Sequence, residues 1–253
     1  MQKSNIGWTT NTHNFWSGCQ KVSTGCKFCY MHRILEGHGK NPNKVVRADD
    51  RYFYAPFKDK ESKLIFTCSM SDFFIEEADQ WRQRAWKLIR KTPWHTWQIL
   101  TKRPERITEC LPPDWGEHGY PNVWLGVTVE DNASIHRMET LSTIPAAIRF
   151  VSGEPLLEEV DFLARNSKGE RLIDAFQWVI LGGESGNTWG KYRYRICKLQ
   201  WLQKALTDLK RNTTAAVFVK QLGTYLVKRH GLKHWHGADI NEFPDYLKVQ
   251  EMP

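Results

Sequence analysis

Three cysteines lie close together near the start of this 253-residue chain, in the segment Gly18–Tyr30, which reads GCQKVSTGCKFCY. Cys19, Cys26 and Cys29 have the spacing C-x6-C-x2-C, and the short second gap lets two sulfurs point toward one centre. Thiolates are soft ligands that suit zinc or iron–sulfur clusters. The segment therefore predicts a metal centre held by these three cysteines.

The number of protein ligands separates two kinds of metal centre. Three thiolates leave one position of a [4Fe–4S] cluster open, and a substrate or cofactor can bind the metal there. A structural zinc site needs a fourth protein ligand, and His32 can supply it in the spacing C-x6-C-x2-C-x2-H. This second interpretation describes a zinc-stabilised nucleic-acid-binding module without catalysis.

Six short apolar runs recur along the chain, each with the length and the β-branched or aromatic composition of a buried strand. Such continuous apolar character is typical of a parallel sheet covered on both faces. The amphipathic stretches Glu77–Lys91, Asn132–Ser142 and Lys198–Arg211 predict helices between them. The runs are Leu64–Met70, Thr96–Thr101, Val123–Val129, Ile148–Ser152, Trp178–Gly182 and Ala216–Lys220.

The alternation of strands and helices predicts an α/β fold built from βαβ units. With a weaker strand near the N-terminus, it favours a complete or partial TIM-like (β/α) barrel of parallel strands. A doubly wound open sheet is the alternative. We expect residues 1–223 to form the barrel that carries the cysteine loop, and residues 224–253, which have no clear period, to form an irregular C-terminal cap.

Polar residues follow each apolar run, where the carboxyl ends of parallel strands form the active face of α/β folds. Lys102, Arg103 and Lys220 are candidate substrate-binding residues, because such cations can meet carboxylate or phosphate groups. A hydrolase is a further alternative, with acidic residues as acid–base groups and the cysteines structural. Its candidate residues are Asp72, Glu130, Glu154 and Glu184.

The composition indicates a globular protein with a polyanionic partner. Hydrophobic residues make up 41% of the chain, and the formal net charge of +8 favours a nucleotide or nucleic acid. No run has the roughly 18 apolar residues of a membrane span, and the first residues lack the apolar run of a secretory signal. We therefore expect a cytoplasmic protein with no membrane partner, in which cysteines are thiols or metal ligands.

The cysteine loop resembles that of the radical S-adenosylmethionine (radical SAM) enzymes, whose usual signature is C-x3-C-x-aromatic-C. The second half matches in Cys26-Lys27-Phe28-Cys29, while the first gap has six residues instead of three. The chain as a whole resembles an uncharacterised phage-associated family with a three-cysteine motif. The blocks that carry this resemblance are GCQKVSTGCKFCY, FTCSMSDFF, WQILTKRPERI, VWLGVTVED, FVSGEPLL, WVILGGESG, FVKQLG and GADINEFP.

The resemblance implies a [4Fe–4S] cluster on the three cysteines that cleaves S-adenosylmethionine to a 5′-deoxyadenosyl radical. It implies an external electron donor and a protein partner, and the basic charge of the chain favours a nucleotide or nucleic-acid-related substrate. Phe28 would pack on the adenine of the cofactor. The other cofactor-binding residues that it implies are Ser69, Ser71 and Asp72 for the ammonium group, Thr128 and Glu130 for the ribose, and then Glu154, Gly182, Gly183 and Glu184.

Overall fold

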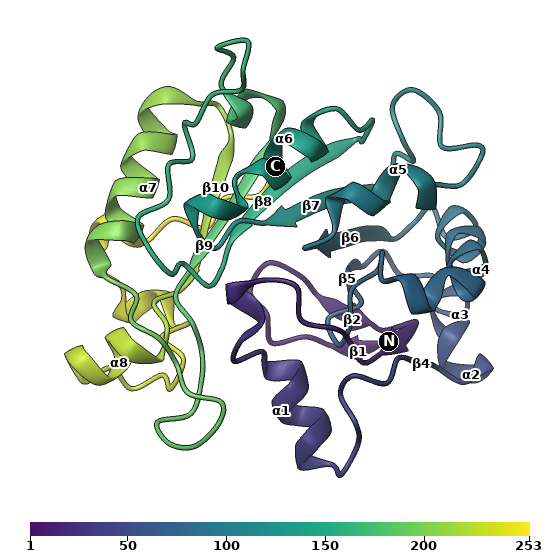
Figure 1. Cartoon of the computed structure of the whole chain (residues 1–253), viewed down its shortest axis with the longest axis horizontal. Helices are drawn as coiled ribbons and strands as arrows, with labels where there is room; N and C mark the ends of the chain where they lie inside the picture. The colour runs from purple at the N-terminus through teal and green to yellow at the C-terminus, as the bar shows by residue number, and fades with distance from the viewer.

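Eight strands form one curled, mostly parallel sheet, an open half-barrel, in the computed structural model of residues 1–253 (Figure 1). Only β1 and β2 pair antiparallel within it. Two short strands, β3 (Trp16–Ser17) and β4 (Val46–Arg47), pair apart from this sheet. The strands of the half-barrel, in spatial order, are β1 (Gln2–Lys3), β2 (Asn11–His13), β5 (Leu64–Thr67), β6 (Thr96–Thr101), β7 (Val123–Thr128), β8 (Ile148–Gly153), β9 (Trp178–Gly182) and β10 (Ala216–Gln221).

The spatial order of the strands follows the order of the chain from β2 to β10. A doubly wound sheet reverses its strand order at a switch point, and no reversal occurs here, so the doubly wound alternative is wrong. The predicted α/β fold is confirmed in the form of a half-barrel. Its edge strands, β1 and β10, do not pair with each other, so the sheet stays open.

Helices connect successive parallel strands and pack around the outside of the sheet (Figure 1). The three helices and six strands predicted from periodicity are confirmed, with ends that differ by a few residues. The helices are α1 (Tyr30–Gly37), α2 (Asp50–Phe53), α3 (Ala55–Lys58), α4 (Asp79–Arg90), α5 (Ile107–Cys110), α6 (His136–Ser142), α7 (Leu199–Asn212) and α8 (Thr224–His230).

The first apolar run leaves the sheet earlier than predicted. Strand β5 ends at Thr67, and Cys68 has a φ of 60°, in the left-handed region that non-glycine residues rarely adopt. The amide of Cys68 donates to the carbonyl of His13, and its own carbonyl accepts from Ser71. The chain therefore turns sharply at Cys68.

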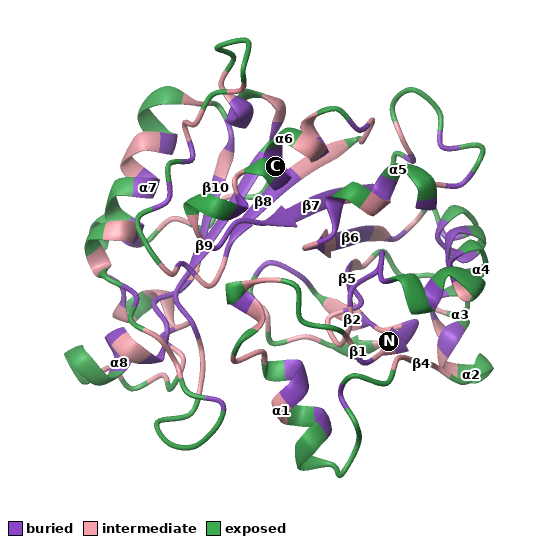
Figure 2. Cartoon of the chain, viewed as in Figure 1, coloured by how far each residue is buried: buried purple, intermediate pink, exposed green.

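The central strands of the sheet are largely buried (Figure 2), and the two faces of the sheet bury different side chains. Val151, Val179 and Val217 belong to the large apolar core that also includes residues of α4, α6 and α7. The alternate residues Phe150 and Trp178, which pair in register, point to the opposite, inner face. There they join a separate aromatic cluster, which consists of Trp8, Phe66, Phe150, Trp178, Ile180 and Phe218.

The segment after Gly223 is not wholly irregular, because it begins with the helix α8. The last residues run along the free edge of β10, where Val219 donates to the carbonyl of Val249 and Glu251 donates to that of Val217. Phe243 and Leu247 are buried in the large core. No helix of the chain combines the length and the apolar character that a membrane crossing requires.

Candidate metal centre at the carboxyl edge of the sheet

The cysteine loop lies between β3 and α1. A single 3₁₀ turn, Thr24–Cys26, leads to Cys29, and α1 begins at the next residue, Tyr30. Cys19, Cys26 and Cys29 are half-buried, whereas Cys68, Cys110 and Cys197 are buried, and all six are free thiols. The loop therefore brings together the only cysteines that are partly exposed.

The surroundings of the three thiols differ. Burial raises the pKa of Cys19 to about 12 and also raises that of Cys29. Burial acts in the same direction on Cys26, but the Lys102 ammonium and hydrogen bonds from nearby backbone amides outweigh it, so the pKa of Cys26 is lowered. The negative charge of Cys26 contributes to the raised pKa of both other thiols.

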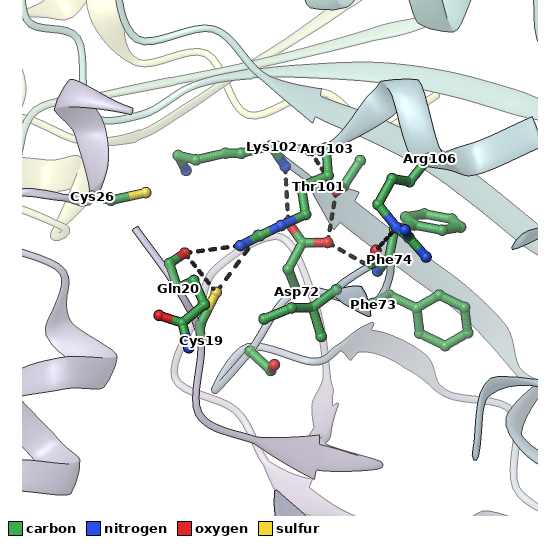
Figure 3. A network of polar contacts seen from close by, with 12 residues as sticks. Cys19, Gln20, Cys26, Asp72, Phe73, Phe74, Thr101, Lys102, Arg103 and Arg106 are labelled. Carbon is green, nitrogen blue, oxygen red and sulfur yellow. Dashed lines mark hydrogen bonds and ion pairs between the residues drawn. The ribbon is translucent and has the colours of Figure 1, made fainter. Parts of the chain in front are cut away.

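A buried ion pair holds the first cysteine (Figure 3). Arg103 lies 3.3 Å from the carboxylate of Asp72, and both side chains are less than 10% exposed. The same guanidinium contacts Sγ of Cys19 at 3.6 Å and donates to the carbonyl of Gln20 at 2.9 Å. Asp72 also accepts from the hydroxyl of Thr101 and from the amides of Lys102 and Phe74. Both oxygens of this carboxylate are therefore engaged within the protein, one of them with Arg103.

Glu130, just beyond β7, holds the middle of the loop. Its carboxylate, which is completely buried, pairs with Arg137 of α6 at 2.7 Å. It accepts from the hydroxyl of Ser23 and from the amide of Gly25. A Cβ atom at Gly25 would lie 2.6 Å from this carboxylate, so only glycine fits beside it. Glu130 thus fixes the two residues on either side of Thr24.

Glu184, just beyond β9, acts on the loop through an arginine. Arg195 forms an ion pair with Glu184, and its Nη1 donates to the carbonyl of Thr24 at 2.7 Å. On the opposite side, the hydroxyl of Ser71 donates to the carbonyl of Gly18. Three strand-end carboxylates that were candidate ligand-binding groups, Asp72, Glu130 and Glu184, therefore have arginine partners and support the cysteine loop.

Lys102 and Glu154, two other candidate residues, form no side-chain hydrogen bond with the cysteine loop. Lys102 extends toward Cys26 in Figure 3, and its ammonium has no hydrogen-bond acceptor in the protein. Glu154 pairs with Lys220 across the inner face of the sheet. The hydroxyl of Tyr30 donates to the carbonyl of Ser69, and the charge of Glu154 contributes to the raised pKa of Tyr30 after the larger effect of burial.

The remaining candidates lie in the same region. Phe28 is half-buried, with Lys27 and Arg195 each 5.3 Å from the centre of its ring. Thr128 is buried at the end of β7. A Cβ atom at Gly183 would lie 2.2 Å from the carbonyl oxygen of Leu222, whereas Gly182 approaches Glu154 and Gln221. Gly183 therefore allows close packing of β9 against β10.

The two kinds of metal centre need different arrangements of donor atoms. No three His, Cys, Asp or Glu side chains are grouped as ligands of a single metal ion. In a [4Fe–4S] cluster each thiolate binds a different iron atom, so its three thiolates need not converge on one point. His32 is buried, and it hydrogen-bonds to the backbone of Cys19. Three half-buried thiols, with Arg103 beside Cys19 and Lys102 near Cys26, are donors of the type that a cluster takes.

Two hollows on the surface lie away from this site. One, of about 310 Å³, is lined by Asp79, Arg82, Arg106 and three neighbours, and the other, of about 280 Å³, lies between Tyr54, Phe57 and α4. Neither contains a cysteine of the loop. Arg106, which follows β6 in sequence, pairs with Asp79 and Glu109 and so belongs to the first hollow.

Sequence reasoning did not identify the residues that connect the strand ends to the loop. Arg137 lies in α6 and Arg195 in the irregular segment between β9 and α7, and nothing in the cysteine motif singles out Ser23 and Gly25 as contacts of the strand ends. The one available signal was the alternation of aromatic and basic residues in Lys191–Arg195 (KYRYR).

The fold and the site together define a class: an open α/β half-barrel with a three-cysteine loop held at the carboxyl edge of its parallel strands. The chain belongs to the family described as "Protein of unknown function (DUF5131)", whose model matches residues 3–244. No curated protein and no solved structure matches it.

Proposed function

We propose that Cys19, Cys26 and Cys29 bind a [4Fe–4S] cluster and that the chain is a radical SAM-type enzyme with a partial TIM-like barrel. The observation that carries this proposal is the position of the loop. It brings three partly exposed thiols to the edge of a parallel sheet where active sites of such folds lie. Four separate supports hold it there, from Ser71, Arg103, Glu130 and Arg195.

When bound, the cluster would supply the electron that cleaves S-adenosylmethionine to a 5′-deoxyadenosyl radical. The protein's own residues hold and tune the thiolates. Arg103 beside Cys19 and Lys102 near Cys26 place positive charge against two of the three sulfurs. Because thiolates on iron carry negative charge, these cations would stabilise the ligated form.

The roles of the candidate cofactor-binding residues divide into two groups in this proposal. Asp72, Glu130 and Glu184 act as positioning residues for the loop, because their carboxylates already have arginine partners. Glu154 and Lys220 form an ion pair at the carboxyl edge of the sheet. This pair does not hold the cysteine loop. Their charges match the amino and carboxylate groups of the cofactor, and Phe28 offers a ring for its adenine.

An enzyme of this type needs a substrate, a reductant and a compartment in which its thiols stay reduced. The substrate would be a nucleotide or nucleic-acid-related molecule, and the reductant would be an external electron donor. Free thiols at all six cysteines fit a reducing compartment, so we place the protein in the cytoplasm. A protein partner and a relation to phage-associated proteins remain part of the proposal.

Metal content and cofactor cleavage test the proposal directly. The full chain, purified without oxygen, is expected to be brown and to contain about four iron and four sulfide per molecule. With a chemical reductant and S-adenosylmethionine it should release 5′-deoxyadenosine. Cys26→Ala should lose both iron and cleavage, whereas Cys197→Ala, at a cysteine outside the loop, should retain both.

A colourless protein with one zinc per chain would contradict the proposal and would support the zinc-stabilised binding module. In that case His32→Ala should lower the zinc content. A Cys26→Ala protein with its full iron content would show that the cluster, if present, is held elsewhere.

A further inference from the structure

The excess positive charge of the chain is concentrated around the cysteine loop. Residues 18–34, 186–198 and 224–238, which we call the basic rim segments, contain ten Lys and Arg and no Asp or Glu. The whole chain has 36 basic and 28 acidic residues, so the rest of it has 26 basic against 28 acidic. The net charge of +8 is therefore a property of these three segments.

Direct contacts join the three segments. Arg33 of α1 donates to the side chain of Asn187 at 2.9 Å, and the amide of Gly186 donates to the hydroxyl of Thr224 at 3.2 Å. The tail loop packs against the start of α8, because the amide of Gly223 donates to the carbonyl of His236 at 3.1 Å and the amide of Leu222 to that of Gly237 at 2.8 Å. In Figure 1, α1, α8 and the loop that precedes α7 lie next to one another.

Most of these cations have no carboxylate partner in the protein. Lys191 pairs with Glu36 and Arg195 with Glu184, but the other eight have no carboxylate within salt-bridge distance. Arg193 is exposed in the turn closed by a bridge between Asn187 and Arg193. An uncompensated group of cations around one site attracts a polyanion, and its binding must weaken as salt rises.

Two exposed tryptophans stand among these cations. Trp189 is 82% exposed and Trp235 is 68% exposed, the highest values among the large hydrophobic residues of the chain. Trp235 stacks on His236, with ring centres 3.7 Å apart and planes inclined by 27°. Aromatic rings beside cations are the surfaces on which bases of single-stranded nucleic acid stack, whereas the bases of a duplex are already stacked on each other.

We propose that the basic rim segments bind single-stranded nucleic acid, with bases stacked on Trp189 and Trp235 and phosphates on Arg33, Arg193 and the neighbouring lysines. This inference rests on the proposed function, because it assigns the substrate class of that same site. A strand bound there lies beside the cysteine loop, since Arg33 is four residues beyond Cys29. The target of the chemistry is then a nucleotide within a strand.

Fluorescence anisotropy of a labelled strand of about 15 nucleotides tests this proposal on the full chain purified without oxygen. DNA and RNA strands of one sequence and the matching DNA duplex are compared, from about 50 to about 200 mM salt. We expect the single strands to bind more tightly than the duplex and to weaken as salt rises. The RNA and DNA arms show which sugar the site prefers.

Matched variants locate the binding surface. Trp189→Ala and Trp235→Ala should each weaken binding about 10-fold, and Arg193→Ala should lower the salt slope by about 0.7. Phe57→Ala, at a ring that is 46% exposed on the far helix α3, and Lys58→Ala are the controls and should bind like the wild type. Because all five residues lie at the surface, thermal denaturation should show that the variants stay folded.

Three results would overturn the inference: no binding of any strand, tighter binding of the duplex, or rim variants that bind as well as the controls. Iron content and cofactor cleavage are measured on the same samples. Iron with cleavage but no strand binding would refute this inference alone. Strand binding through Trp189 and Trp235 by an iron-free protein would refute the proposed enzyme and leave the binding surface in place.

Discussion

Glu130 and Ser23 are 107 residues apart in the chain, yet the Ser23 hydroxyl donates a hydrogen bond to the Glu130 carboxylate. The same carboxylate is paired with Arg137 at the start of α6. One buried acidic residue therefore joins the sheet, a helix outside it and the cysteine loop.

Replacing Glu130 should damage both stability and the loop. In Glu130→Gln the buried guanidinium of Arg137 loses its charge partner, which costs about 3–5 kcal/mol of unfolding free energy. Urea denaturation measures this loss, and iron content after anaerobic reconstitution should fall as well. Glu139→Gln, on the exposed side of α6, is the control and should change stability by less than about 0.5 kcal/mol. Equal effects of the two substitutions would refute the role of Glu130.

Gly25 lies in the cysteine loop and Gly37 at the end of α1, and the space around the two glycines differs. A Cβ atom at Gly25 would lie 2.6 Å from Glu130, whereas a Cβ atom at Gly37 has no atom within 4 Å. Gly25→Ala should therefore displace the loop and lower both melting temperature and iron uptake. Gly37→Ala should leave iron uptake unchanged and stabilise the protein by up to about 1 kcal/mol. Normal iron uptake by Gly25→Ala would show that the loop does not need this close contact.

Arg103 should not be replaceable by lysine. Its planar fork contacts Asp72, Cys19 and the carbonyl of Gln20 together, and a lysine ammonium cannot reproduce that geometry. Arg103→Lys should therefore keep the charge but loosen the segment around Cys19, which limited proteolysis of the iron-free protein can detect. Arg84→Lys, on the exposed side of α4, serves as the comparison. Identical cleavage patterns for both variants would contradict the role assigned to Arg103.

His13 should make stability depend on pH below neutrality. Burial lowers the pKa of His13 from 6.5 to about 3, and its Nε2 hydrogen-bonds to the carbonyl of Phe53. Between these values the unfolded chain binds a proton at this residue and the folded chain does not. Stability therefore falls as pH drops below 6.5, by about 1.4 kcal/mol per pH unit, and the loss ends near pH 3.

Urea denaturation of the wild type and of His13→Gln at pH 7 and pH 5 isolates this effect. Glutamine keeps a hydrogen-bond donor but does not titrate. The difference in stability between the two pH values should be smaller in the variant by roughly 2 kcal/mol. The same pH dependence in both proteins would show that His13 is not the group responsible.

The pattern of the sequence was sufficient to locate the strands and the longer helices. The runs Val123–Val129 and Trp178–Gly182 are almost continuously apolar because both faces of β7 and β9 are covered. Apolar content does not specify strand order, however, so the sequence alone could not separate the half-barrel from a doubly wound sheet. The early end of β5 at Thr67 also left no signal, because Cys68 is as apolar as the strand before it.

The candidate site could be predicted only in part. The cysteines were recognisable from their spacing, and the strand-end acids were recognisable from their place after apolar runs. What these acids do depends on Arg103, Arg137 and Arg195, whose distances from Asp72, Glu130 and Glu184 are set by tertiary packing. Whether a carboxylate is free for a ligand or paired with an arginine cannot be read from local sequence.

The segment at the C-terminus affects the tendency of the protein to aggregate. A half-barrel leaves one edge of its parallel strands unpaired, and an exposed edge can recruit strands from other molecules. Residues Val249–Glu251 occupy that edge by hydrogen bonding to Val217 and Val219, and Glu251 also accepts from the indole of Trp178. The segment therefore protects the protein from aggregation. When it is removed, the open edge of β10 should pair with strands of other molecules.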